Sequence, residues 1–158
     1  MVDKDKILDD LEKLFDADVV DIKREGDRIE FSKKLYDTVA LGDNLKKDLV
    51  DVGYELFTVA VIINDDNTYT TMDIVDKSNM SGGSLGLSGE STREVGEKKI
   101  YKGFYGVIGF DKDTGEKGII TKTWDCNELK KPIFNRLNSL GLTKKKATVD
   151  QQFKELGK

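Results

Sequence analysis

The sequence predicts an α+β fold: an antiparallel sheet of hairpins with one N-terminal helix and two C-terminal helices. In the middle of the chain, short stretches of alternating apolar and polar residues are separated by turn residues, which is typical of hairpins. The clearest helical spacing of apolar residues is at the two ends of the chain. Parallel strands would need long crossover segments between them, and the short turns leave no room for these.

The N-terminal helix is predicted over residues 3–15. Its apolar side chains fall on one stripe at helical spacing: Ile7, Leu8, Leu11, Leu14 and Phe15. Asp3 and Asp5 lie near the positive end of the helix dipole, where a negative charge is favourable.

The strands begin with a hairpin around the turn at residues 25–27, followed by a short third strand from Tyr36 to Leu41. Asp43 can cap a brief helix that ends at Gly53. Residues 54–63 are apolar on both faces and rich in β-branched side chains, so we expect a central strand there.

Two further hairpins complete the predicted sheet. Residues 68–75 return antiparallel to the central strand, and a last pair of strands flanks the turn at residues 111–115. We expect Phe104 to lie in the core, on one side of its strand with Ile100, Ile108 and Phe110. Trp124 should pack under a C-terminal helix.

The C-terminal region reads as two helices. One should begin near Pro132, since proline suits the first helical position, and end at Gly141. The other begins with a capping box formed by Thr148 and Gln151. Its apolar stripe consists of Val149, Phe153 and Leu156.

Composition indicates a single domain over residues 1–158, because 37% hydrophobic and 35% charged residues suit a chain that folds in water. The charged N-terminus lacks the apolar core of a secretory signal. One cysteine, Cys126, cannot form an internal disulfide, which fits a reducing compartment. We therefore expect a cytoplasmic protein without membrane attachment.

The absence of histidine is the strongest indication about chemistry. It excludes the Ser-His-Asp and Cys-His arrangements, and together with the single cysteine it excludes the common zinc ligand sets within one chain. Residues 82–86 match the letters of a nucleophile elbow, but the chain has no histidine to serve Ser84. Residues 111–115 resemble the start of a calcium loop, yet Lys122 stands where an acidic ligand is required. We expect no catalytic residue, no cofactor and no metal.

Residues 78–97 are rich in glycine and serine and read as a flexible insertion between two strands. Leu85 and Leu87 are large apolar side chains in this segment. We expect them to anchor a partner, with Ser84 and Ser88 forming adaptable hydrogen bonds at the rim. The alternative is that the two leucines fold back and cover a gap in the core.

Charge is divided unevenly along the chain, whose net charge is −4. Residues 1–116 carry a net charge of −10, whereas the segment from residue 117 onward carries +6. The basic C-terminal helical segment, from about residue 126, includes three consecutive lysines in a connector: Lys144, Lys145 and Lys146. These lysines are the candidate contacts for nucleic acid.

These observations favour a non-catalytic macromolecule-binding module: a protein-binding adaptor, an inhibitor or a chaperone-like accessory whose partner is a protein. Two alternatives stay open. One is a nucleic-acid-associated protein that uses the basic segment, and the other is a small enzyme that works without histidine through Asp, Glu, Lys or Tyr.

Overall fold

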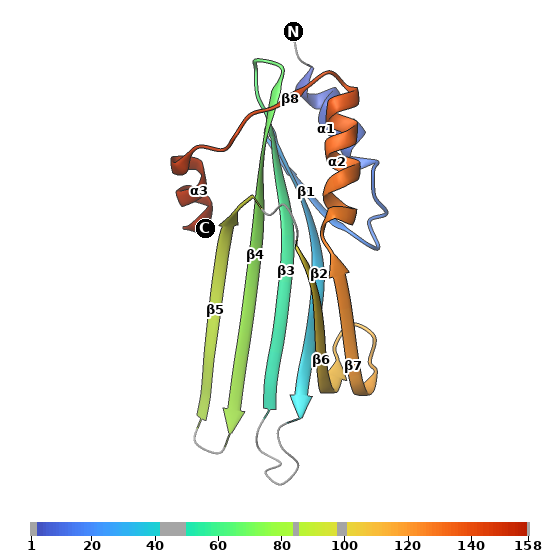
Figure 1. Cartoon of the computed structure of the whole chain (residues 1–158), viewed down its shortest axis with the longest axis vertical. Coiled ribbons are helices and arrows are strands. Elements are labelled where there is room, and N and C mark those ends of the chain that lie inside the picture. The colour runs from blue at the N-terminus through green and yellow to red at the C-terminus, as the bar shows by residue number, and fades with distance from the viewer. Residues whose placement is uncertain (1–2, 42–49, 84–85, 98–100, 158) are drawn as a thin grey trace.

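The computed structural model describes residues 3–41, 50–83, 86–97 and 101–157. In these ranges the chain forms an eight-stranded sheet, an N-terminal helix and two C-terminal helices (Figure 1), which confirms the predicted α+β fold class. The elements are α1 (Lys4–Glu12), β1 (Asp21–Glu25), β2 (Arg28–Leu41), β3 (Val50–Ile63), β4 (Thr68–Gly83), β5 (Gly86–Gly96), β6 (Lys102–Asp111), β7 (Lys117–Asp125), α2 (Asn127–Ser139), β8 (Thr143–Lys144) and α3 (Val149–Leu156).

The strand order is β5-β4-β3-β2-β6-β7, and these neighbours pair antiparallel. The strand predicted at residues 54–63 is central, as expected. One edge of β2 serves two partners, since β1 pairs with residues 28–32 and β6 pairs with residues 38–40. The two-residue β8 adds a short parallel pairing to β4.

The main core lies on the face of the sheet that α1 and α2 cover. Leu8 and Leu11 of α1 and Ile133 and Leu137 of α2 are fully buried there. Their partners on the sheet alternate along the strands: Ile29, Phe31, Phe57, Val59, Val61 and Ile63. This burial explains why the predicted helical stripes form helices, because isolated helices of this length are marginal in water.

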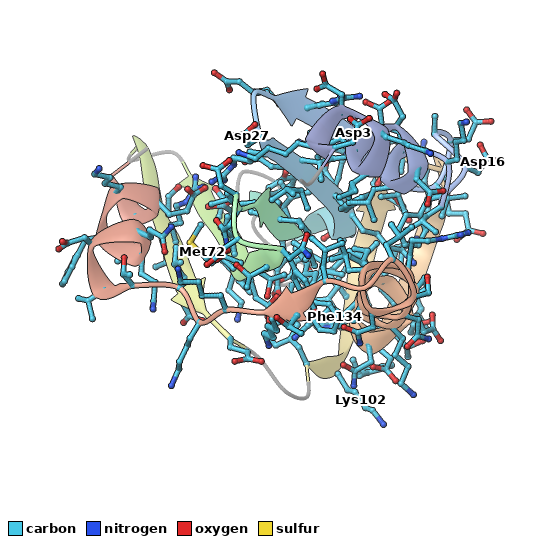
Figure 2. All side chains as sticks on the ribbon, turned by 90° about the horizontal axis from the view of Figure 1, so that it is seen from above. Asp3, Asp16, Asp27, Met72, Lys102 and Phe134 are labelled. Carbon is cyan, nitrogen blue, oxygen red and sulfur yellow. The ribbon has the colours of Figure 1, made fainter. Side chains whose placement is uncertain are left out.

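The opposite face carries a smaller cluster of Ala60, Met72 and Ile74, against which Val95 and Ala147 pack. Seen from above, α3 lies on this side, away from α1 and α2, with Met72 between the sheet and α3 (Figure 2). Both faces of the central strands are therefore covered where the helices lie, and the far ends of β2 to β5 extend beyond them (Figure 1).

Residues 78–97 differ from the flexible insertion that their composition predicts. The structure places residues 78–83 at the end of β4 and residues 86–96 in β5, with Ser78 opposite Ser91 and Ser81 opposite Ser88. Glycine and serine have low strand propensity, but β3 pairs with β4 all the way to Gly82 and offers it a continuous template. Pairing along the whole strand outweighs the local propensity.

The brief helix predicted between Asp43 and Gly53 is wrong at its C-terminal end, because residues 50–53 are the start of β3. Its first part, residues 43–49, lies outside the described residues. The predicted third strand is also not separate, since β2 runs from Arg28 to Leu41 with an irregularity between Lys34 and Tyr36.

The prediction that Phe104 and Ile108 belong to the core is wrong. Their side chains are 68% and 65% exposed. The inner face of β6 is formed instead by Tyr105 and Val107, with Gly103 leaving room for a tryptophan ring. The period of two is correct, but both faces of this strand carry apolar residues, so the pattern cannot say which face is buried.

Helix α2 begins at Asn127, not near Pro132, which lies inside the helix. The buried stripe of Leu129, Ile133 and Leu137 starts before the proline and continues through it. Core contacts before and after Pro132 therefore stabilise the helix, although the proline has no backbone N–H to donate. The capping box of Thr148 and Gln151 is confirmed at the start of α3.

Among the helices that the structure describes, none is long and apolar enough to cross a membrane.

Candidate functional site

A cavity of about 230 Å³ lies where the segment after α1, the strands β2, β3 and β7, and the first turn of α2 meet. Its lining residues come from all five segments: Phe15, Val19, Val20, Lys33, Leu35, Phe57, Thr123, Trp124, Asp125, Cys126, Glu128 and Leu129. We call it the Trp124 cavity.

The Trp124 cavity has an apolar interior and a charged rim. The buried lining residues are Val20, Leu35, Phe57, Cys126 and Leu129. Phe15 and Trp124 are half-buried. The charged lining residues are Lys33 and Glu128, which are exposed, and the half-buried Asp125. Both signs of charge therefore border the opening, with two carboxylates against one lysine.

The indole of Trp124 is held across the β6–β7 hairpin. Gly103 lies directly opposite Trp124, and a Cβ at that position would be 2.3 Å from the indole Cζ2, so only glycine leaves room for the ring. The ring centroid lies 5.8 Å from that of Tyr36 and 6.5 Å from that of Tyr101. The indole N–H is buried and has no hydrogen-bond acceptor among the described residues.

The thiol of Cys126 lines the same cavity and is buried. Burial, and then the negative charges of Asp73 and Glu55, raise its pKa to about 12. A thiol with such a pKa stays protonated at neutral pH and is a poor nucleophile. Cys126 therefore contributes an uncharged, polarisable surface to the cavity.

A buried carboxylate, Glu55, lies behind the cavity wall with only 2% of its side chain exposed. The hydroxyl of Tyr36 donates to its Oε1 at 3.1 Å, the hydroxyl of Tyr101 donates to its Oε2, and Lys77 Nζ lies 3.7 Å from Oε1. Burial, and then the nearby Glu55 charge, raises the pKa of both phenols. The two tyrosines stay protonated and act as donors that satisfy the carboxylate.

Tyr36, whose ring lies near Trp124, also packs against Tyr105. Their rings are stacked with centroids 3.8 Å apart and an interplanar angle of 2°. The hydroxyl of Tyr105 lies 2.7 Å from Thr38 Oγ1 and fills the space that a Cβ at Gly53 would need. This packing joins β6 to β2 and β3 across the core face.

The outer face of the β6–β7 hairpin is apolar and exposed. Ile108 pairs directly with Ile119, which is 78% exposed, and Phe104 lies on the same face of β6. The positions between these side chains on this face are uncharged: Gly106, Thr121 and Thr123. We call Phe104, Ile108 and Ile119 the outer apolar face.

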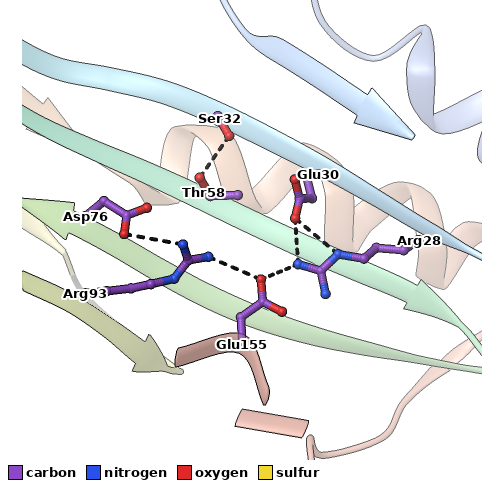
Figure 3. Close-up of polar contacts among 7 residues, drawn as sticks. All are labelled: Arg28, Glu30, Ser32, Thr58, Asp76, Arg93 and Glu155. Atoms are coloured by element: carbon purple, nitrogen blue, oxygen red, sulfur yellow. Dashed lines mark hydrogen bonds and ion pairs between the residues drawn. The ribbon is translucent and has the colours of Figure 1, made fainter. Parts of the chain in front are cut away.

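Helix α3 is attached to the sheet by its polar side. Glu155 is 2% exposed and lies between two arginines, with Arg28 Nη2 at 2.5 Å and Arg93 Nη2 at 3.3 Å from its Oε1 (Figure 3). Arg28 also donates to Glu30, and Arg93 lies 3.7 Å from Asp76 (Figure 3). The apolar stripe of α3 faces outward, since its three side chains are 41–66% exposed: Val149, Phe153 and Leu156.

Of the four residues predicted to bind a partner, the structure places two, Leu87 and Ser88, near the start of β5. Ser84 and Leu85 lie outside the described residues. Leu87 pairs with Gly82 and Ser88 pairs with Ser81 in the backbone register. Their placement in β5 is that of strand residues, and their role in binding stays a prediction.

The three lysines predicted as nucleic-acid contacts are exposed, but two of them face acidic side chains. Lys144 bonds to Glu97 and lies 5.2 Å from the centroid of the Phe134 ring, and Lys145 Nζ is 3.4 Å from Asp66 Oδ2. Lys144 and Lys146 also border a second depression, of about 340 Å³, beside the start of α3. Intramolecular pairing of this kind reduces the charge that the lysines offer to a phosphate backbone.

Sequence reasoning missed both the outer apolar face and the Trp124 cavity. The cavity depends on residues from five segments that no local pattern connects. The outer apolar face had a signal, because two glycines, Gly103 and Gly109, fall on the strand face opposite Phe104 and Ile108. Glycine within a strand often marks the close approach of another group.

The described part of the chain contains no group of three or more cysteine, aspartate or glutamate side chains placed to hold a metal ion. No model of a known protein family matches the sequence, and neither the curated proteins nor the solved structures include a match.

Proposed function

We propose that the protein is a non-catalytic protein-binding module that receives an extended segment of its partner along β7. The observation that carries this proposal is the outer apolar face of the β6–β7 hairpin, at an edge of the sheet. In the described part of the chain, β7 pairs with β6 alone, so its other edge keeps backbone groups for a further strand.

Single exposed apolar side chains are ordinary on protein surfaces, so their arrangement matters more than their number. Ile108 and Ile119 are direct cross-strand neighbours, and Phe104 lies four residues along the same face. No charged residue separates them on this face, although 35% of the chain is charged. A continuous apolar strip of this kind marks an interaction surface.

The two edge strands of the sheet, β5 and β7, differ in the side chains they carry. Along β5, charged residues such as Arg93 and Glu94 accompany the strand, and α3 reaches this side through Glu155. Along β7, the outward side chains are Lys117 and Asp125 at the two ends and Ile119, Thr121 and Thr123 between them. Natural proteins commonly protect edge strands with charges or covering elements, so the uncharged middle of the β7 edge is the better site for strand addition.

The geometry defines the kind of segment that fits. Main-chain hydrogen bonds to β7 would supply affinity, and alternate apolar side chains of the segment would pack on the outer apolar face. The bound segment should therefore be extended, apolar at every second position and free of proline where it pairs.

The test is selection from a displayed library of random 16-residue peptides, followed by backbone amide exchange on the complex. Selected peptides should show alternating apolar residues and should slow exchange at outward amides of β7. Changing Ile119 to lysine should weaken their binding at least about tenfold, because the charge would be buried against an apolar side chain.

The matched control is Phe153→Lys, which places the same charge on the exposed stripe of α3 and should leave binding unchanged. Peptides that protect no β7 amide, or that bind the Ile119→Lys variant as tightly as the unchanged protein, would contradict the proposal. Concentration-dependent dimerisation that the same variant abolishes would assign the edge to self-association instead.

A further inference from the structure

We infer that the Trp124 cavity binds a small uncharged aromatic molecule, up to the size of a fused two-ring system. This site lies between the segment after α1 and the first turn of α2, whereas the proposed strand-binding surface is the outer side of β6 and β7, and Thr123 borders both. The inference therefore goes beyond the proposed function and does not depend on it.

The volume sets the size of the ligand. An apolar cavity of about 150 Å³ holds benzene, and a liquid water molecule takes about 30 Å³. The Trp124 cavity, at about 230 Å³, leaves room for a second fused ring. Larger amphiphiles would have to extend out of the opening into solvent.

The lining sets the shape and polarity. The rings of Phe15, Phe57 and Trp124 border the space, and Val20 and Leu129 complete its buried surface. Aromatic ligands gain from edge and offset contacts with such rings in addition to the area they bury. The protonated Cys126 adds no charge to this surface.

The apolar interior disfavours ionised ligands of either sign. The charged side chains of Lys33, Asp125 and Glu128 lie at the rim, whereas the buried lining residues are uncharged. Burying a charged group among them without a matching partner is costly, so the neutral form is selected.

The test uses 2-naphthol, which has two fused rings and a neutral hydroxyl at pH 7. Trp124 is the one tryptophan in the sequence, so a single indole N–H signal in ¹H–¹⁵N NMR spectra reports on the cavity. Titration should shift this signal to saturation with a Kd below about 1 mM. Naphthalene-2-carboxylate and 2-(aminomethyl)naphthalene, with the same rings but opposite charges, should bind at least about tenfold more weakly. No saturable shift, or equal affinity for a charged analogue, would overturn the inference.

The location is tested with Val20→Phe, which places a ring inside the cavity and should abolish the 2-naphthol shift. The matched control is Val95→Phe, the same exchange in the cluster on the opposite face of the sheet, which should leave binding intact. A second measurement on the unchanged protein covers the case in which Val20→Phe does not fold. Bound 2-naphthol should show intermolecular nuclear Overhauser effects between its ring protons and the indole protons of Trp124. Binding that survives Val20→Phe, or a saturated complex without these effects, would place the ligand elsewhere.

Discussion

Replacing Glu155 with glutamine tests whether charge holds α3 on the sheet. In most surface helices the apolar stripe faces the core, but in α3 that stripe faces outward and a carboxylate is buried instead. The substitution keeps the size of the side chain and removes its charge. If the contact with Arg28 and Arg93 is the main attachment, α3 should detach without unfolding the rest of the protein.

The expected cost can be worked out from the partners. Removing one member of a fully buried ion pair costs about 3–5 kcal/mol, because the other charge is left without compensation. Here Arg28 keeps Glu30 and Arg93 keeps Asp76, and the two arginine side chains are 16% and 28% exposed. We therefore expect a loss nearer 1–3 kcal/mol, as for a charge-assisted hydrogen bond in a half-buried site.

Native-state hydrogen exchange measures this loss where it occurs. Amides of residues 152–156 should exchange faster in Glu155→Gln by the factor that corresponds to the free-energy loss, about tenfold for each 1.4 kcal/mol. Amides of β3 should be unchanged, since α3 contributes none of the side chains of the main core. Asp150→Asn is the matched control, because it removes a charge from the exposed side of the same helix.

Two results would refute this reasoning. Unchanged exchange in α3 would mean that the carboxylate contributes nothing to docking and that the contacts of Ala147 with the sheet suffice. Equal acceleration in α3 and β3 would mean that α3 does not open as a separate unit.

Three further substitutions test the packing and the buried charges. Gly103→Ala should cost about 1–3 kcal/mol in urea unfolding by overpacking and should change the fluorescence of Trp124, whereas an unchanged emission would show that the ring does not occupy the glycine. Because burial raises the pKa of Tyr36 and Tyr101 in the folded state, stability should be intact below about pH 10 and should fall above it, and Tyr36→Phe should flatten that fall. An equally steep alkaline loss in the phenylalanine variant would contradict this. The pKa of Asp111 is lowered chiefly by its hydrogen bond from a lysine of β7, so its contribution should be present above about pH 4 and lost below it, and Asp111→Asn should reduce the acid sensitivity of unfolding.

The elements that the sequence predicted correctly are those with a strong local signal. Helix α1 has a complete apolar stripe and an aspartate cap, and α3 has a capping box within four residues. The hairpin turn at Gly26 needs a left-handed backbone conformation, with φ of 57°, that glycine adopts without strain. In each case the information lies within a few residues, where propensity and capping decide the structure.

The elements that were predicted wrongly depend on a distant neighbour. Residues 78–97 have the composition of a loop, but residues 78–83 pair with β3 as part of β4, and residues 86–96 pair with β4 as β5. Which face of β6 points outward depends on Trp124, a residue of the other strand of the hairpin. Its ring packs over Gly103 on the inner face. No window of sequence around either segment contains the partner that decides its structure.

The same limit explains why the candidate sites from the sequence and from the structure differ. In the sequence, Leu85 and Leu87 stand out because apolar residues are unexpected in a loop, and their role in binding stays a prediction. Leu87 lies in β5, and an apolar residue within a strand needs no such explanation. In the structure, the unexpected apolar residues are Phe104, Ile108 and Ile119, which lie in a well-paired hairpin and yet face solvent. An apolar side chain that stays exposed in a well-paired strand loses the free energy that burial would supply. It is therefore a stronger indication of binding than an apolar residue in a segment of unknown conformation.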